Sequence, residues 1–355
     1  MANFNFHDIV GLQLRTDSPE AANFYRAELM AYAGDHGEGL PAVDLKWRHS
    51  SIPRSPGPGY QREVHKQLAR WYFRLELNEN RVEIDCVGNR IAIPIVWHML
   101  VEPSLRYLAA MRGSLMLHAA AVVRSGKSLI FTGSGGVGKT TTSSLLLRYE
   151  PQWKLHADDY VFLGPGSRSY AFVTRAHAYA DLLRWLPELR HSLTAAEVLR
   201  LLFFGWIRKL SGERLKLPVR LEASRLWPGR ETALSADVGA VLLLGGRSDG
   251  KVTLRRLGSQ DKPATKMLTI NFHEMRHFIR LLRRFMGEQA ADKNLSEWRD
   301  REREFLDKLV RETAIYELRI PMRAQSSDTL SRHLSSELAG LLNAQSEGIR
   351  SIKIE

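Results

Sequence analysis

The feature that most constrains this chain is a glycine-rich segment, Gly133-Ser-Gly-Gly-Val-Gly-Lys-Thr140, which fits the pattern G-x-x-x-x-G-K-[ST] of a phosphate-binding loop (P-loop). Its glycines let the backbone turn N–H groups inward around phosphate oxygens. The lysine of the pattern reaches the β- and γ-phosphates, and the threonine hydroxyl is a ligand for Mg²⁺. Such a loop requires a strand before it and a helix after it.

Both flanking segments have the required character. Residues 128–132 form a short apolar run with β propensity, and residues 141–149 carry an apolar stripe at helical spacing. The helix would direct the positive end of its dipole at bound phosphates. A chance glycine loop is the alternative, and the flanking elements disfavour it. We expect these residues to bind a nucleoside triphosphate: Gly133, Ser134, Gly135, Gly136, Val137, Gly138, Lys139, Thr140 and Thr141.

Two adjacent aspartates, Asp158 and Asp159, follow the P-loop by about one helix and one short strand. We expect the strand over residues 154–157 to return beside the P-loop strand. Its carboxyl end would place the pair where ligands of open α/β sheets bind. One aspartate would hold Mg²⁺ beside Thr140, and the other would accept a proton from an attacking hydroxyl. Paired acids also occur in solvated turns, but the neighbouring P-loop favours the functional interpretation.

A histidine precedes the P-loop on an expected strand. Residues 115–123 and 128–132 flank a turn, and an antiparallel hairpin with Arg124 opposite Lys127 pairs positions whose numbers sum to 251. In this register His118 lies opposite Gly133, at the edge of the loop. A purely structural histidine remains the alternative, because a histidine on a strand often has no chemical role.

Together these residues resemble the HPr kinase/phosphorylase family. The resemblance covers residues 114–163, through Leu117-His-Ala-Ala-Ala-Val-Val, the P-loop and His156-Ala-Asp-Asp159, and extends weakly through 240–244 and 316–321. The family is similar to phosphoenolpyruvate carboxykinase, and its members phosphorylate a serine of a small carrier protein using ATP and Mg²⁺. The resemblance implies an α/β fold with a P-loop kinase core of that type, and a homo-oligomer.

The resemblance also implies roles for individual residues. His118 corresponds to the active-site histidine and Lys139 to the P-loop lysine. Asp158 resembles the general base. Asp159 resembles the acid on the metal side, which would hold Mg²⁺ together with Thr140.

The sequence departs from the family at three places. Members follow the P-loop lysine with serine and an acidic residue, whereas Thr140 and Thr141 stand here. Their glutamate-bearing strand has no counterpart in residues 172–179, and their C-terminal signature for the reverse phosphorolysis is not recognisable. These departures weigh against the family's carrier protein as acceptor and against phosphorylase activity. They favour a divergent HPr-kinase-related protein, a group in which some members modify peptides.

The rest of the chain predicts two domains, a β-rich one over residues 1–110 and a catalytic one over 111–355 with a helical C-terminal part. In the first domain we expect strands over 9–14, 71–77, 81–86 and 90–95, a loop over 51–59 and a helix from 96 to 111. In the second we expect helices over 180–210, a hairpin of 240–245 with 252–257 around a turn at 247–250, helices over 272–310 and a strand and helix over 316–342.

The net charge of +12 is concentrated in residues 168–256, which hold 16 basic and 8 acidic residues. This segment could hold ATP phosphates, an acidic acceptor or nucleic acid. A solvated basic face is the alternative. No nucleic-acid-binding signature accompanies it, so a nucleic acid is not favoured. The densest cluster comprises Arg208, Lys209, Arg214, Lys216 and Arg220.

Three further features limit the class of protein. Residues 273–277 match the zinc-protease pattern H-E-x-x-H, but Arg276 puts a cation within it and no third ligand is apparent. Cys86 is the single cysteine, which excludes an intramolecular disulfide. The N-terminus does not resemble a signal peptide, and no apolar run reaches the ~18 residues of a membrane span. We therefore expect a soluble, cytoplasmic protein with no membrane partner.

These features predict an ATP- and Mg²⁺-dependent kinase that transfers the γ-phosphoryl group to a hydroxyl, with serine of a protein or peptide as the favoured acceptor and an acidic acceptor as one option. Two alternatives stay open. One is a kinase that acts on a small molecule, and the other is a non-catalytic regulatory protein that binds a nucleoside triphosphate.

Overall fold

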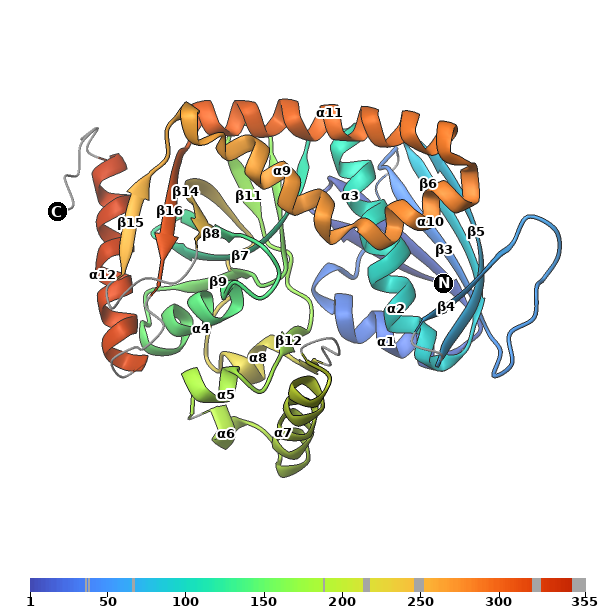
Figure 1. The fold of residues 1–355 in the computed structure, drawn as a ribbon, viewed down its shortest axis with the longest axis horizontal. Coiled ribbons are helices and arrows are strands. Elements are labelled where there is room, and N and C mark those ends of the chain that lie inside the picture. Colours follow the sequence, from blue (N-terminus) through green and yellow to red (C-terminus); the bar gives the residue numbers. More distant parts are fainter. Residues whose placement is uncertain are drawn as a thin grey trace. The chain divides into compact units, whose positions relative to one another are not determined.

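The computed structural model describes the chain except for residues 36, 38, 66, 67, 188, 213–217, 246–251, 321–326 and 347–355. Its contacts form two compact units (Figure 1). The first unit comprises Met1–Met116, Leu163–Pro165 and Ala264–Lys308, and the second comprises Leu117–Phe162, Gly166–Pro263 and Leu309–Glu355. Residues 264–308, which we expected in the catalytic domain, therefore belong to the unit of the N-terminal sheet.

The first unit is built on a six-stranded sheet in the order β1-β2-β3-β6-β5-β4. Strands β2, β3 and β6 are parallel, and the outer pairs are antiparallel. Along β5, Trp71, Phe73 and Leu75 are buried and alternate with more exposed residues, so one face of the sheet carries the core. The strands are β1 (Ala2–Phe6), β2 (Val10–Thr16), β3 (Ala42–His49), β4 (Gln61–His65), β5 (Ala69–Asn78) and β6 (Arg81–Gly88).

The segment expected as a strand over residues 90–95 is helical, so that prediction was wrong. Asn89 begins the helical turn, because its side-chain oxygen accepts a hydrogen bond from the Ala92 N–H at 3.2 Å. Pro94, in the first turn of α2, suits a helix start. The helical elements from the N-terminal part of the unit are α1 (Pro19–Leu29), η1 (Met30–Tyr32), η2 (Arg90–Ala92), α2 (Ile93–Val96), η3 (Trp97–Val101) and α3 (Glu102–Met111).

Three helices from late in the sequence contribute residues 264–308 to the first unit: α9 (Pro263–Glu274), α10 (Arg276–Met286) and α11 (Glu288–Glu312). Arg106 of α3 makes a buried bidentate ion pair with Glu302 of α11, at 2.6 and 2.5 Å. On β4, the carboxylate of Glu63 accepts hydrogen bonds from Arg280 and Arg284 of α10 at 3.1 and 2.9 Å. These charge-assisted contacts explain why α10 and α11 belong with the N-terminal sheet.

The second unit contains a larger sheet in the order β11-β10-β7-β8-β14-β16-β15, with β9 paired to β7. Strands β8, β14 and β16 are parallel, and β7 is antiparallel to both β8 and β9. A separate two-stranded sheet joins β12 and β13. The strands are β7 (Leu115–Arg124), β8 (Lys127–Thr132), β9 (Lys154–Ala157), β10 (Tyr160–Gly164), β11 (Arg168–Tyr170), β12 (Ala176–Ala178), β13 (Val219–Leu221), β14 (Ser235–Leu244), β15 (Thr253–Arg256) and β16 (Ala314–Arg319).

Two predicted neighbour relations in this sheet were wrong. Strand β9 lies beside β7 and not beside the P-loop strand β8. Strands β14 and β15 do not form a hairpin, because β16 lies between them and pairs with both. The turn expected at 247–250 lies outside the described residues. Because β8 and β9 are both antiparallel to β7, their carboxyl ends still meet at one edge of the sheet.

The remaining helices of the second unit pack around its sheet. Helix α12 packs on α4 and β14, and the Ser331 hydroxyl donates to the Leu145 carbonyl oxygen at 2.9 Å. Trp153 and Trp227 are buried, and their indole N–H groups donate to Ser335 and Ser144. The helical elements are α4 (Lys139–Tyr149), α5 (Leu182–Trp185), α6 (Leu189–Ser192), α7 (Ala195–Leu210), α8 (Ala223–Leu226), η4 (Ser259–Asp261) and α12 (Ser327–Ser346).

Candidate active site

The P-loop connects β8 directly to α4, as the sequence predicts. Gly138 caps α4 with φ +109°, a left-handed conformation that side chains disfavour. A Cβ atom on Gly133 would lie 2.8 Å from Cγ1 of Val137, so the loop closes on itself too tightly for a larger residue. The sequence therefore gives the loop the glycine positions that its conformation needs.

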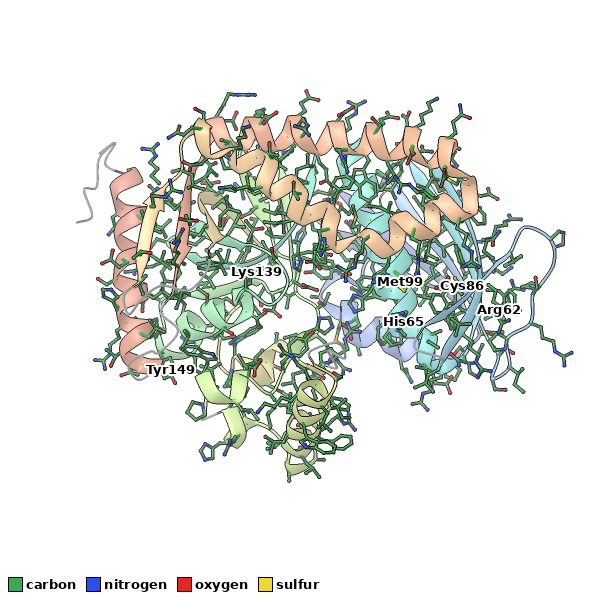
Figure 2. The ribbon with its side chains drawn as sticks, viewed as in Figure 1. Arg62, His65, Cys86, Met99, Lys139 and Tyr149 are labelled. Atoms are coloured by element: carbon green, nitrogen blue, oxygen red, sulfur yellow. The ribbon has the colours of Figure 1, made fainter. Side chains whose placement is uncertain are left out.

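Lys139 begins α4, and its side chain is buried within the loop (Figure 2). Its ammonium group donates to the carbonyl oxygen of Gly133 at 2.8 Å and lies 3.5 Å from that of Ser134. The cation is thereby held over the loop, beside the positive end of the α4 dipole. This is a suitable environment for the terminal phosphates of a nucleotide.

The predicted register of the β7–β8 hairpin is confirmed. Arg124 pairs with Lys127, and the pairing continues to Ala119 opposite Thr132. The Thr132 hydroxyl donates to the carbonyl oxygen of His118 at 3.0 Å. His118 therefore stands one position beyond the last pair, next to the start of the P-loop.

Asp158 lies on the P-loop side of the aspartate pair and is buried. The hydroxyl of Thr140 is close enough to this carboxylate to favour its charged form. Burial, reinforced by the charge of Asp159, raises the pKa of Asp158 to about 7, although the Thr140 hydrogen bond and the charge of Lys139 act in the opposite direction. The Oδ1 atom of Asp158 has no hydrogen-bond partner among the described residues.

Asp159 faces a different environment, with a side chain that is 31% exposed. Its Oδ1 lies 3.3 Å from Nδ1 of His118, and its Oδ2 lies 3.9 Å from Nδ1 of His177. The Ala119 N–H donates to the Asp159 carbonyl oxygen at 3.0 Å, which ties the aspartate to β7. The ring of Tyr160 packs against the imidazole of His118, with centroids 5.2 Å apart. Asp159 is thus a carboxylate bracketed by two imidazoles.

The oxygen atoms on the P-loop side fit a magnesium ion. Mg²⁺ takes oxygen ligands and is held by one or two protein groups together with water and substrate phosphates. The Thr140 hydroxyl and the unpaired, buried Oδ1 of Asp158 are ligands of this type. The sequence predicts that Thr140 and Asp159 form the metal side, and the structure adds an interaction between Thr140 and Asp158.

His177 was not identified as a site residue from the sequence. It lies on β12, opposite Arg220 of β13, and this short sheet presents it to Asp159. Residues 172–179 are the segment in which the family's glutamate has no counterpart. The segment holds several polar residues, and the pairing of β12 with β13 is what brings His177 to Asp159.

The other sequence candidates lie apart from this constellation. Helix α9 ends at Glu274 and α10 begins at Arg276, so His273 and His277 do not share one continuous helix. His273 contacts Arg276 at 2.9 Å, and His277 packs against His65. Among the described residues, no group of three or more potential ligands is placed to hold a metal ion.

The basic cluster is described only in part. Arg208 pairs with Asp181 at 2.9 Å, and Lys209 is exposed on α7. Arg220 lies on β13, while Arg214 and Lys216 fall outside the described residues. Within the described ranges, no helix is long and apolar enough to cross a bilayer.

Comparisons with known proteins give little independent information. No protein-family model matches the chain, and no curated protein matches it. Among solved structures, the Hpr(Ser) kinase/phosphatase from Coxiella burnetii aligns with 67% of this chain and 99% of its own, at 11% sequence identity and a TM-score of 0.28. A TM-score of this size does not establish a common fold.

Proposed function

We propose that this protein is an ATP- and Mg²⁺-dependent kinase that phosphorylates a hydroxyl group of a protein or peptide. One observation carries the proposal: a P-loop with its lysine and threonine shares one sheet edge with two carboxylates in different surroundings. One carboxylate, Asp158, is buried against Thr140. The other, Asp159, is partly exposed between two histidines. Phosphoryl transfer needs this division between a metal side and an acceptor side.

The contacts favour exchanging the roles that the sequence suggested for the aspartates. Thr140 and Asp158 would hold Mg²⁺, which when bound offsets charge on the β- and γ-phosphates. Asp159 would accept the proton of the acceptor hydroxyl as its oxygen bonds to the γ-phosphorus and the bond to the bridging oxygen breaks, releasing ADP. His118 and His177 would orient the Asp159 carboxylate.

Lys139 and the loop N–H groups would stabilise the charge that develops on the transferring group. Lys139 already lies within the loop and is directed at its carbonyl oxygens, so it needs little movement to meet a phosphate. The preference for a serine of a protein or peptide rests on the sequence resemblance to the HPr kinase/phosphorylase family.

The roles are tested by three variants with γ-labelled ATP and a cell extract as the source of acceptors. Lys139→Ala should lose ATP binding. Asp159→Asn should bind ATP normally and lose label transfer at least 100-fold. Asp158→Asn should raise the Mg²⁺ concentration needed for half-maximal transfer about tenfold. Asp237→Asn, an exposed aspartate of the same unit, is the matched control.

The labelling experiment also distinguishes the proposed kinase from the two alternative functions. Label in a metabolite and not in protein or peptide would indicate a small-molecule kinase. A regulatory protein would show ATP binding that depends on Lys139, no transfer with any fraction, and a function insensitive to Asp159→Asn. Transfer by Asp159→Asn at the wild-type rate with an increased Mg²⁺ requirement would restore the roles that the sequence suggested.

A further inference from the structure

Helix α7 has apolar side chains on both of its faces. The inward side carries the buried Leu201, whereas five large apolar side chains point outward. Their positions repeat every three or four residues, which places them on one stripe of the helix. The rings of Phe203 and Trp206 stack at its centre, with centroids 6.3 Å apart. We call these residues the α7 stripe: Leu199 (69% exposed), Leu202 (48%), Phe203 (52%), Trp206 (58%) and Leu210 (69%).

The exposed charged side chains of α7 itself are basic. Arg200 and Lys209 flank it and are exposed. Glu197 is the only acidic residue of α7, and it is engaged by Arg225 at 2.5 and 2.6 Å. A second copy of the chain would bring the same cations against each other. The stripe is therefore complementary to an acidic, apolar partner and not to itself.

Within the second unit, contacts link helix α7 to the candidate active site. The guanidinium of Arg208 lies over the ring of Tyr179, 5.8 Å from its centroid. Tyr179 directly follows β12, and His177 of β12 lies 3.9 Å from Asp159. Figure 1 shows α7 and β12 as neighbouring parts of this unit. A partner seated on α7 is thus connected through one short strand to the acceptor side of the site.

We propose that the α7 stripe docks a segment of the acceptor polypeptide that carries apolar residues at helical spacing together with acidic residues. This inference rests on the proposed kinase function and specifies the class of its acceptor. An anionic lipid surface is the competing ligand. Segments that bind such lipids carry about four to eight Lys or Arg residues. Helix α7 carries three, of which Arg208 is paired with Asp181, so Arg200 and Lys209 are its exposed basic side chains, which favours the polypeptide.

The chain contains an intrinsic fluorescent probe for the α7 stripe, the exposed Trp206. Six of its eight tryptophans are fully buried, Trp185 is partly buried, and Trp206 is exposed. Acrylamide quenching of the full-length protein therefore reports mainly on the α7 stripe. The test ligand is a synthetic 16-residue peptide with leucines at helical spacing and glutamates between them. A matched peptide with lysines replacing the glutamates, and vesicles containing phosphatidylglycerol, complete the set.

We expect the acidic peptide to shift tryptophan emission to shorter wavelength and to reduce quenching at least twofold. Trp206→Phe should abolish the response. Lys209→Glu should weaken peptide affinity about tenfold, and Leu234→Ser, which changes another exposed leucine of the same unit, should leave it unchanged. No response to the acidic peptide, an equal response to the lysine peptide, or protection by the vesicles alone would overturn the proposal.

This binding assay contains no ATP, so it fails or succeeds independently of the kinase function. Once an acceptor is known from the labelling experiment, Phe203→Ser should raise its KM about tenfold with kcat unchanged. An unchanged KM would refute the docking role and leave the kinase function intact. If the peptide binds but no fraction of the extract receives label, the docking role of the α7 stripe would stand and the proposed kinase function would be refuted.

Discussion

Asp158 and Asp159 differ in environment although they are neighbours in the chain. Asp158 is buried against Thr140, and Asp159 is open to solvent between His118 and His177. Such a separation lets two carboxylates perform different tasks. The burial of Asp158 also lowers the stability of the folded protein, and this loss can be measured without nucleotide.

The cost is a pH-dependent loss of stability. The pKa of Asp158 is about 7 in the folded protein and 3.8 in its ordinary state. Between these values the folded form keeps a proton that the unfolded chain has released, so stability falls as pH rises towards 7 and is level above it. In EDTA, Asp158→Asn should raise the free energy of unfolding at pH 8 by about 2 kcal/mol, with an upper limit of about 4 kcal/mol.

Urea unfolding at pH 8 and at pH 4 measures this effect. At pH 4 the gain should nearly vanish, because Asp158 is protonated in the folded protein and about half protonated in the unfolded chain. Asp237→Asn, at an exposed position, should change neither value. Equal stability of Asp158→Asn and the wild type at pH 8 would contradict a strained carboxylate.

His177 gives a second test at this scale. If it orients Asp159, His177→Ala should lower kcat about tenfold with the Kd for ATP unchanged, because the carboxylate loses an imidazole that holds its orientation. His177→Asn, whose amide can stand near the position of Nδ1, should restore part of the rate. A loss of ATP binding in His177→Ala, or no rescue by asparagine, would indicate a structural role.

Much of the site could be predicted from sequence because its signals are local. The P-loop glycines follow from backbone conformation, and the position of His118 follows from counting across a two-residue turn. The contact between Asp158 and Thr140 could not be predicted, because the turn after β9 decides which of two adjacent side chains points inward. His177 reaches Asp159 through a separate small sheet, and no local pattern shows that pairing.

At the scale of elements, helix α7 begins with a capping box formed by Thr194 and Glu197. The Thr194 hydroxyl accepts from the Glu197 N–H at 3.3 Å, and the Glu197 carboxylate accepts from the Thr194 N–H at 2.9 Å. The hydrogen bonds from Arg225, together with those from Thr194, lower the pKa of Glu197 to about 2. This one carboxylate joins the start of α7 to α8.

Glu197→Gln should therefore destabilise the protein in a pH-dependent way. A carboxylate with a lowered pKa contributes stability that is present above about pH 4.5 and is lost as pH falls towards 2. Since the pair is partly solvent-screened, we expect a loss of about 1 kcal/mol at pH 7. Thermal unfolding between pH 2.5 and 7 measures it, with Glu222→Gln, at a more exposed ion pair, as the control. A loss that persists undiminished at pH 2.5 would contradict this.

Elements were predictable where the apolar periodicity was regular, as in β5 and α4. Apolar residues alternate over 90–95 as they would in a strand, but Asn89 caps this segment as a helical turn. The error at β14 and β15 had a different cause. Strand β16, from much later in the chain, inserts between them, and pairing over that separation leaves no trace in the local sequence.

At the scale of the whole molecule, the first unit depends on a buried ion pair between distant segments. Arg106 and Glu302 are 1% and 0% exposed. Removing one partner leaves an uncompensated buried charge, so Glu302→Ala should cost about 3–5 kcal/mol. Hydrogen exchange should increase in residues 102–111 and 264–308, while the ATP binding that we propose for the second unit should be retained.

Glu297→Ala, at an exposed position of the same helix, is the control and should alter exchange little. If Glu302→Ala abolished ATP binding without raising exchange in the first unit, the assignment of α11 to that unit would be wrong. The sequence could not predict this assignment, because the helical pattern of 272–310 shows an amphipathic face but not the sheet that receives it.

The interleaving of the two units has a consequence for biosynthesis. A ribosome releases the strands of the first unit early, but α9, α10 and α11 emerge only after nearly all of residues 117–263 has been made. Protein synthesis proceeds at about 5–20 residues per second, so several seconds or more separate the synthesis of Arg106 from that of Glu302. During this time Arg106 lacks its counterion. A chaperone that shields this intermediate, or a slow stretch of codons near its completion, would therefore affect the yield of the protein more than its final stability.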